Sequence, residues 1–192
     1  MQNKKQVVKK KTAQKKAGKF ECTLYTGKGD DGFSCGMGGK RCAKHDPFLD
    51  VMGTFDECSV YIGLLRSSVP VKKGKFEAVK FIKPTQEALQ AIASCLYTKK
   101  KVDVGLNRKL KTLTKNYEDF IRTVASPGAF VLPGDSLISS IAHLARVSAR
   151  KLERACANPA FDGILTLEAR AFLNRLSSFF FALSLNILEN GY

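Results

Sequence analysis

The segment AFLNRLSSFFFALSLNIL, residues 171–188, constrains the fold of this chain more than any other stretch. Its apolar residues would lie on nearly every side of a helix, so other helices or another subunit must cover it. Its longest apolar run, FFFALSLNIL, is too short to span a bilayer, and Asn174 and Arg175 closely precede that run. We therefore expect a central core helix of a helical protein, with no membrane association.

The rest of the chain also has helical patterns. Asp46 and Pro47 are typical of an N-cap followed by proline at the first helical position, and FLDVMGTFDECSVYIGLL then continues with apolar residues mostly at helical spacing. Pro84 should kink the second helix or start it afresh. There is no series of strands and no internal repeat, and 192 residues suit one domain. We predict an all-α, antiparallel five-helix bundle behind an N-terminal glycine-rich loop, with its later helices at about 76–97, 110–124, 135–157 and 164–189.

The strong positive charge does not by itself indicate nucleic-acid binding. The formal net charge is +15, but residues 1–19 contain eight lysines and no acid. We interpret residues 1–19 as a basic disordered tail before a domain at 20–192, with RNA, an anionic surface or an import receptor as conceivable partners of the tail. Nucleic acid is disfavoured as a partner of the domain, which lacks a recognition motif.

Targeting and redox signals agree with an intracellular location. The tail has no apolar segment of a secretory signal. The six cysteines form no C-x-x-C pair and the chain has two histidines, so no zinc site is predicted and a reducing compartment is favoured. We expect a cytoplasmic protein, or one of the mitochondrial matrix if the source is eukaryotic.

The stretch YTGKGDDG, residues 25–32, matches the spacing G-x-G-x-x-G. Neither a buried strand before it nor a helix after it supports a dinucleotide-binding turn. A P-loop fails too, because Ser34 and Arg41 stand where glycine and Ser or Thr are needed. Two interpretations remain: a flexible surface loop, or a loop whose backbone N–H groups and cations, such as Lys28, Lys40 and Lys44, face an anion.

The fourth predicted helix has two faces. Helical spacing places Ile141, Leu144, Ala145, Ser148, Leu152 and Ala155 on one side, and His143, Arg146, Arg150, Glu153 and Arg154 on the other. The polar side is either a solvated face or an anion site in a cleft beside the fifth helix. The planar guanidinium group of arginine can donate two hydrogen bonds to the oxygens of a phosphate. Glu153 could hold a magnesium ion that bridges those oxygens.

Three regions together resemble the PduO-type ATP:cob(I)alamin adenosyltransferases. The segments are LYTGKGDDGFSCGMGGKRCAKHDPFLDVMGTFDE, FVLPGDSLISSIAHLARVSARKLER and FLNRLSSFFFAL. They match, in order, the family's glycine-rich loop with its G-T-x-D-E helix, its F-x-L-P-G turn before H-x-x-R-x-x-x-R-x-x-E-R, and its L-N-R-L-S helix. The resemblance implies a five-helix bundle, usually a homotrimer, with active sites between subunits.

The resemblance also implies roles for individual residues. The ATP-binding residues would be Thr26, Gly27, Lys28, Gly29, Ser34, Cys35 and Lys44 of the loop, Arg150, Lys151, Glu153 and Arg154 of the fourth helix, and Asn174 of the fifth. The corrinoid site would contain Ser178, an Asp56–Arg146 pair, and Phe130 against the lower face of the ring, where it displaces the axial ligand. Asp56, Phe130, Arg146 and Arg150 would serve catalysis.

The implied reaction needs no protein nucleophile. Co(I) of the corrinoid attacks the 5′-carbon of ATP, so the protein must align the two substrates and stabilise the triphosphate that leaves. ATP, Mg²⁺ and a corrinoid are the expected ligands, and a reductase and an adenosylcobalamin-dependent enzyme are the implied partners. Ser178 replaces the usual aspartate of the family, which leaves a non-catalytic corrinoid carrier or sensor as the alternative.

Overall fold

The structure, a computed structural model, describes residues 26–69 and 77–191. The predicted tail, Cys22 and the lysine-rich link after Val69 lie outside the described residues. Five long helices carry the fold: α1 (Pro47–Ser68), α2 (Ile82–Thr98), α3 (Val104–Thr123), α4 (Leu137–Cys156) and α5 (Leu167–Glu189). Short 3₁₀ turns occur at η1 (Met37–Gly39), η2 (Glu77–Phe81) and η3 (Pro159–Phe161).

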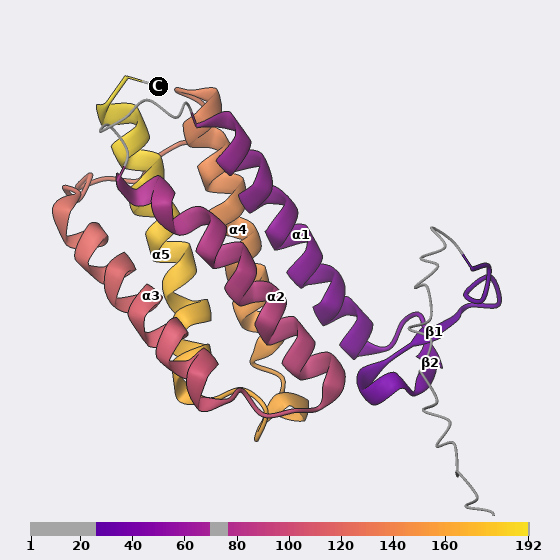
Figure 1. The fold of residues 1–192 in the computed structure, drawn as a ribbon. Helices are drawn as coiled ribbons and strands as arrows, with labels where there is room; N and C mark the ends of the chain where they lie inside the picture. The colour runs from indigo at the N-terminus through magenta and orange to yellow at the C-terminus, as the bar shows by residue number, and fades with distance from the viewer. Residues whose placement is uncertain (1–25, 70–76, 192) are drawn as a thin grey trace, which may run out of the picture.

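The helices form an antiparallel bundle, as predicted. Consecutive helices run in alternating directions (Figure 1), and each packs against two others in the closed order α1, α2, α3, α5, α4. Side-chain caps fix where the helices begin: Asp46 accepts from the backbone N–H of Phe48 at 2.8 Å, and Ser136 and Thr166 cap α4 and α5 in the same way. Pro84 lies in the first turn of α2, after η2, so this helix starts afresh there.

The start of α3 differs from the prediction. It begins at Val104 rather than near Leu110, because Asp103 caps it by accepting from the N–H of Leu106 at 2.7 Å. Apolar spacing missed this turn because Val104 is 75% exposed and its neighbours are polar.

A short antiparallel ribbon was also missed. Strands β1 (Phe33–Cys35) and β2 (Arg41–Ala43) pair with Ser34 opposite Cys42. The ribbon lies beyond the end of the bundle where α1 begins (Figure 1). It touches α2 through Tyr97, whose hydroxyl lies 3.2 Å from the Cys35 sulfur. Three-residue strands between glycines give too short an alternation to be recognised in a sequence.

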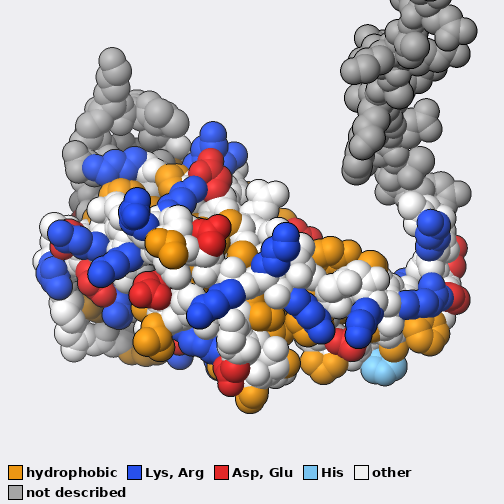
Figure 2. Space-filling view, turned by 60° about the horizontal axis from the view of Figure 1, so that its bottom comes forward, with side chains coloured by type: hydrophobic (Ala, Val, Ile, Leu, Met, Phe, Trp, Pro, Cys, Tyr) orange, Lys and Arg blue, Asp and Glu red, His pale blue; other side chains and the backbone are white. Residues whose placement is uncertain are grey.

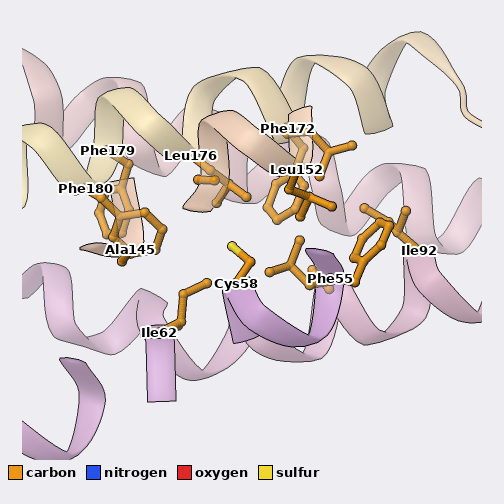
Figure 3. Packing of buried hydrophobic residues seen from close by; sticks show 14 of the residues in the cluster. Phe55, Cys58, Ile62, Ile92, Ala145, Leu152, Phe172, Leu176, Phe179 and Phe180 are labelled. Atoms are coloured by element: carbon orange, nitrogen blue, oxygen red, sulfur yellow. The ribbon is translucent and has the colours of Figure 1, made fainter. Parts of the chain in front are cut away.

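The core is built around α5, as its composition predicts. Figure 3 shows Phe55, Cys58 and Ile62 of α1 facing side chains of α4 and α5. Phe179 stacks on Tyr117 of α3 with ring centroids 4.4 Å apart, and the Tyr117 hydroxyl lies 2.6 Å from Thr85 Oγ1. Phe179 and Tyr117 are fully buried. The bundle therefore closes around aromatic contacts between α3 and α5.

By length and composition alone, α5 is long and apolar enough to cross a membrane. Bundle helices bury 56% of its most apolar window. It is the one such helix among the described residues, and its packing is that of a core helix.

Candidate functional site

A pocket at the loop between α3 and α4 brings together four predicted site residues. Its volume is about 640 Å³, and Phe130, Arg146, Arg150 and Ser178 all line it. The loop residues Ser126–Val131 form one wall, α4 contributes the two arginines, and α5 contributes Ser177, Ser178 and Phe181. Two aromatic rings, two guanidinium groups and three serine hydroxyls thus line one open hollow.

Phe130 is the most exposed large apolar residue of this site. Its side chain is 90% exposed, so within a single chain it is not part of the hydrophobic core. Within a single chain the ring therefore has few packing partners. The exposed ring is free to be covered by a flat ligand.

Arg146 lies deeper than Phe130. Its guanidinium carbon lies 5.8 Å from the centre of the Phe181 ring, a cation–π contact. Its Nε atom is buried without a hydrogen-bond partner among the described residues. The predicted pairing with Asp56 does not occur within the chain: Asp56 is exposed on α1 and lines a separate hollow of about 600 Å³ between α1 and α2.

The predicted polar face of α4 needs correction at two positions. His143 was expected among the polar residues, yet it is 4% exposed. Leu144 was expected in the core, yet it is 45% exposed. The physical reason is that α4 packs against both α1 and α5, so the buried arc extends to the α5 side and includes His143, while the opposite edge at Leu144 stays open.

The predicted ATP residues of α4 and α5 divide into two sets. Glu153 accepts a hydrogen bond from the Asn174 amide, which joins the two helices next to Arg150. Lys151 turns the other way, toward α1, where its Nζ lies 2.6 Å from Glu57 Oε2. Arg150 and Arg154 are exposed, and neither has an ion pair among residues 26–69 and 77–191. The two free guanidinium groups suit an anion that comes from outside the chain.

The glycine-rich loop brings its own predicted residues together. A Cβ at Gly29 would lie 3.3 Å from Lys44 Cε, and the Lys44 N–H donates to the Gly32 carbonyl at 2.9 Å. Thr26 Oγ1 accepts from the Lys28 N–H at 3.4 Å. Gly27 has a φ of 66°, a left-handed conformation that favours glycine. The loop therefore folds back over Lys44.

Ser34 and Cys35 lie on β1, so all seven predicted loop residues belong to one compact unit. Figure 1 shows this unit at the end of the bundle opposite the connection between α3 and α4. None of the seven lines the Phe130 pocket. One chain thus carries the two predicted parts of an ATP and corrinoid site at separate places.

A magnesium ion is compatible with this arrangement only through a bound nucleotide. The described residues contain no group of three His, Cys, Asp or Glu side chains that could enclose a metal. A single carboxylate, Glu153, fits the way Mg²⁺ is usually held, by one or two carboxylates together with substrate phosphates.

Sequence reasoning missed Phe181 and Ser177 as pocket residues. Asn174, Ser178 and Phe181 follow each other at i, i+4 and i+7, a spacing that places them along one side of α5. The spacing alone does not show which of three successive phenylalanines faces the pocket. Phe179 and Phe180 are fully buried, whereas Phe181 is only partly buried.

Comparison with known proteins identifies the family. A sequence model of the cobalamin adenosyltransferases matches residues 24–187. The chain belongs to this family. The corrinoid adenosyltransferase of Citrobacter freundii is 32% identical over 171 residues, which cover 84% of this chain and 92% of that protein. The corrinoid adenosyltransferase of Bos taurus is 30% identical over 169 residues, 84% of this chain and 69% of that protein.

Solved structures agree with the fold of the family. A variant PduO-type ATP:corrinoid adenosyltransferase from Lactobacillus reuteri, complexed with cobalamin and ATP, superposes with a TM-score of 0.71. The match covers 88% of this chain and 96% of that chain, at 23% sequence identity. This chain therefore has the same five-helix fold as that solved structure.

Proposed function

We propose that this protein is a corrinoid adenosyltransferase, which transfers the 5′-deoxyadenosyl group of ATP to the reduced cobalt of cob(I)alamin or a related corrinoid. The observation that carries the proposal is the pocket in which Phe130, Arg146, Arg150 and Ser178 meet, in a chain of the cobalamin adenosyltransferase family. Relatives from bacteria and mammals bear the name of this activity.

The chemistry fits the residues present. The electron pair of Co(I) forms the bond to the 5′-carbon, the bond between that carbon and its oxygen breaks, and the pair leaves with triphosphate. Arg150 and Arg154, both without an ion pair in the described chain, would stabilise the charge of the leaving group. Phe130 would cover the lower corrin face and exclude an axial ligand. A magnesium ion at Glu153 would neutralise phosphate charge.

The placement of the parts supports active sites between subunits, and we propose a homotrimer, as the family resemblance implies. The loop unit and the Phe130 pocket lie apart in one chain, so a neighbouring copy would have to bring a loop to the pocket. The same arrangement would let Asp56 of a neighbouring copy reach the Arg146 guanidinium, whose buried Nε has no hydrogen-bond partner within residues 26–69 and 77–191.

An exposed apolar strip offers the contact surface. Val60 and Leu64 on α1 are 63% and 44% exposed, and Val147 on α4 is 54% exposed. The ion pair between Glu57 and Lys151 holds these two helix edges side by side. We propose that this strip, with Leu144, is buried between subunits.

On the face drawn in Figure 2, the charge pattern does not favour nucleic acid as a partner. Figure 2 shows Lys and Arg side chains spread over one face of the bundle with Asp and Glu between them, not gathered in one block. We place the protein in the cytoplasm, or in the mitochondrial matrix of a eukaryote, with a corrinoid reductase and an adenosylcobalamin-dependent enzyme as its functional partners.

One assay separates this enzyme from a corrinoid carrier. Purified protein, ATP, magnesium and cob(I)alamin under strong reductant should give the absorbance change of adenosylcobalamin formation, and ATP should yield triphosphate in equal amount. If the protein binds the corrinoid without converting it, it is a corrinoid carrier or sensor instead. Ser178, which replaces the usual aspartate of the family, would then be the first residue to test as the cause of the lost activity.

A further inference from the structure

Three buried polar atoms lie behind the Phe130 pocket without a hydrogen-bond partner in the described part of the chain. They are both ring nitrogens of His143 and Nε of Arg146. Leaving a buried donor or acceptor unpaired costs about 1–3 kcal/mol. His143 is 4% exposed and does not line the pocket. A histidine kept there at that cost calls for an explanation beyond packing.

Phe181 links His143 to the pocket. The centre of the imidazole ring lies 6.0 Å from the centre of the Phe181 ring, with the two planes inclined at 52°. The guanidinium carbon of Arg146 lies 5.8 Å from the same ring centre. Phe181 and Arg146 both line the pocket. His143 therefore supports the two groups that form the inner wall of the pocket, from one helical turn away.

The charge state of His143 matters to its neighbour. Burial, and to a smaller extent the charge of Arg146, lower the pKa of His143 from its ordinary value. Arg146 is the one charged group of α1, α4 and α5 whose field contributes. One turn before His143 on α4, Ser139 Oγ donates to the Ser184 carbonyl of α5 at 3.1 Å, and neither of these groups is charged. No carboxylate among these groups would offset a second positive charge.

We propose that His143 is a positioning residue for corrinoid binding: as a neutral imidazole behind Phe181 it allows the Arg146 guanidinium to stay on that ring at the pocket wall, and its protonation displaces Arg146. This inference rests on the proposed function, because it takes the pocket as the corrinoid site. His143 touches neither substrate, so its effect is transmitted by Phe181 and Arg146.

The proposal predicts a pH dependence that affects the corrinoid more than ATP. Of the predicted ATP-binding residues only Arg150 lines the pocket, so ATP affinity should follow the titration of His143 less than corrinoid affinity does. Corrinoid affinity of the full-length protein should be constant above the ordinary histidine range and should fall, by at most about tenfold for each pH unit, once the pH drops below the lowered pKa of His143; the range to be measured runs from about pH 7 down to the acid limit of the folded protein. A histidine that served only packing would weaken both ligands together as the fold loosened.

The test measures the dissociation constants of cob(II)alamin and of ATP across this pH range. The variant His143→Gln, which cannot take up a proton, should lose the pH slope for cob(II)alamin. The chain has one other histidine, so His45→Gln is the matched control and should keep the slope. A slope that persists in His143→Gln, or that disappears in His45→Gln, overturns the proposal.

A second measurement uses the unaltered protein, in case His143→Gln does not fold. Because the corrinoid would bind the neutral form, calorimetry in two buffers of different ionisation enthalpy, at the pH where the affinity falls, should detect protons released on cob(II)alamin binding. Absence of proton release would refute the role of His143. If Phe130→Ala binds cob(II)alamin as tightly as the unaltered protein at every pH, the corrinoid lies elsewhere and the proposed site itself fails.

Discussion

Replacing Phe130 by alanine should impair corrinoid chemistry while leaving the fold almost unchanged. The side chain is 90% exposed, so about a tenth of the transfer free energy of a phenylalanine, about 0.2 kcal/mol, contributes to stability. For a chain of this length that loss lowers the melting temperature by about 1 °C or less. If the corrin covers the ring, about 1.5–3 kcal/mol of burial is lost instead from the bound state, which is about 10- to 100-fold in affinity.

The matched control is Phe179→Ala. Phe179 is fully buried and stacks on Tyr117, so its removal should cost about 3–5 kcal/mol and lower the melting temperature by about 10 °C. Differential scanning calorimetry compares the two variants. Titration with cob(II)alamin and with ATP, and spectroscopy of four-coordinate Co(II), then show which ligand each variant affects.

Two results would refute the reasoning. If Phe130→Ala unfolds as readily as Phe179→Ala, the ring is packed in the assembled protein and its role is structural. If ATP and cob(II)alamin affinities fall equally, the ring does not contact the corrin specifically. The expected outcome is intact ATP affinity, weaker corrinoid binding, less four-coordinate Co(II) and a slower overall reaction that starts from cob(II)alamin.

Four further outcomes are expected. Arg150→Ala should cut turnover by about 10²–10³ at saturating ATP, and an unchanged rate would remove Arg150 from the site. Val147→Glu should dissociate the assembly and lower activity, because it places a charge in the proposed apolar strip. If light scattering shows that the unaltered protein is an active monomer, the active site is not shared between subunits. Deleting residues 1–18 should leave turnover and ATP affinity intact in vitro, and a loss of ATP affinity would mean that the arm contributes to the site. Stability should fall with pH below about 6.5, because the lowered pKa of His143 means that the unfolded chain takes up the proton first; denaturant midpoints at two pH values check this, and His143→Gln should reduce the loss.

Most of the helices could be predicted from the sequence, because helical periodicity and helix caps are local signals. Asp46 followed by Pro47 located the start of α1, and the apolar composition of α5 required a helix covered by others. Each signal depends on residues within one or two turns of each other. The start of α3 was missed because its first turns bury little, so the Asp103 cap was the available sign of it.

The sequence determined the kind of chemistry that this protein can support, because residue types at fixed spacing along α4 and α5 had to share helix faces. It did not determine which faces would be open. His143 and Leu144 exchanged their expected environments because two neighbours, α1 and α5, divide the surface of α4 between them. Only the tertiary structure decided that Phe130, Arg146, Arg150 and Ser178 line one pocket while the glycine-rich loop lies at the other end of the bundle, since that depends on how helices distant in sequence pack.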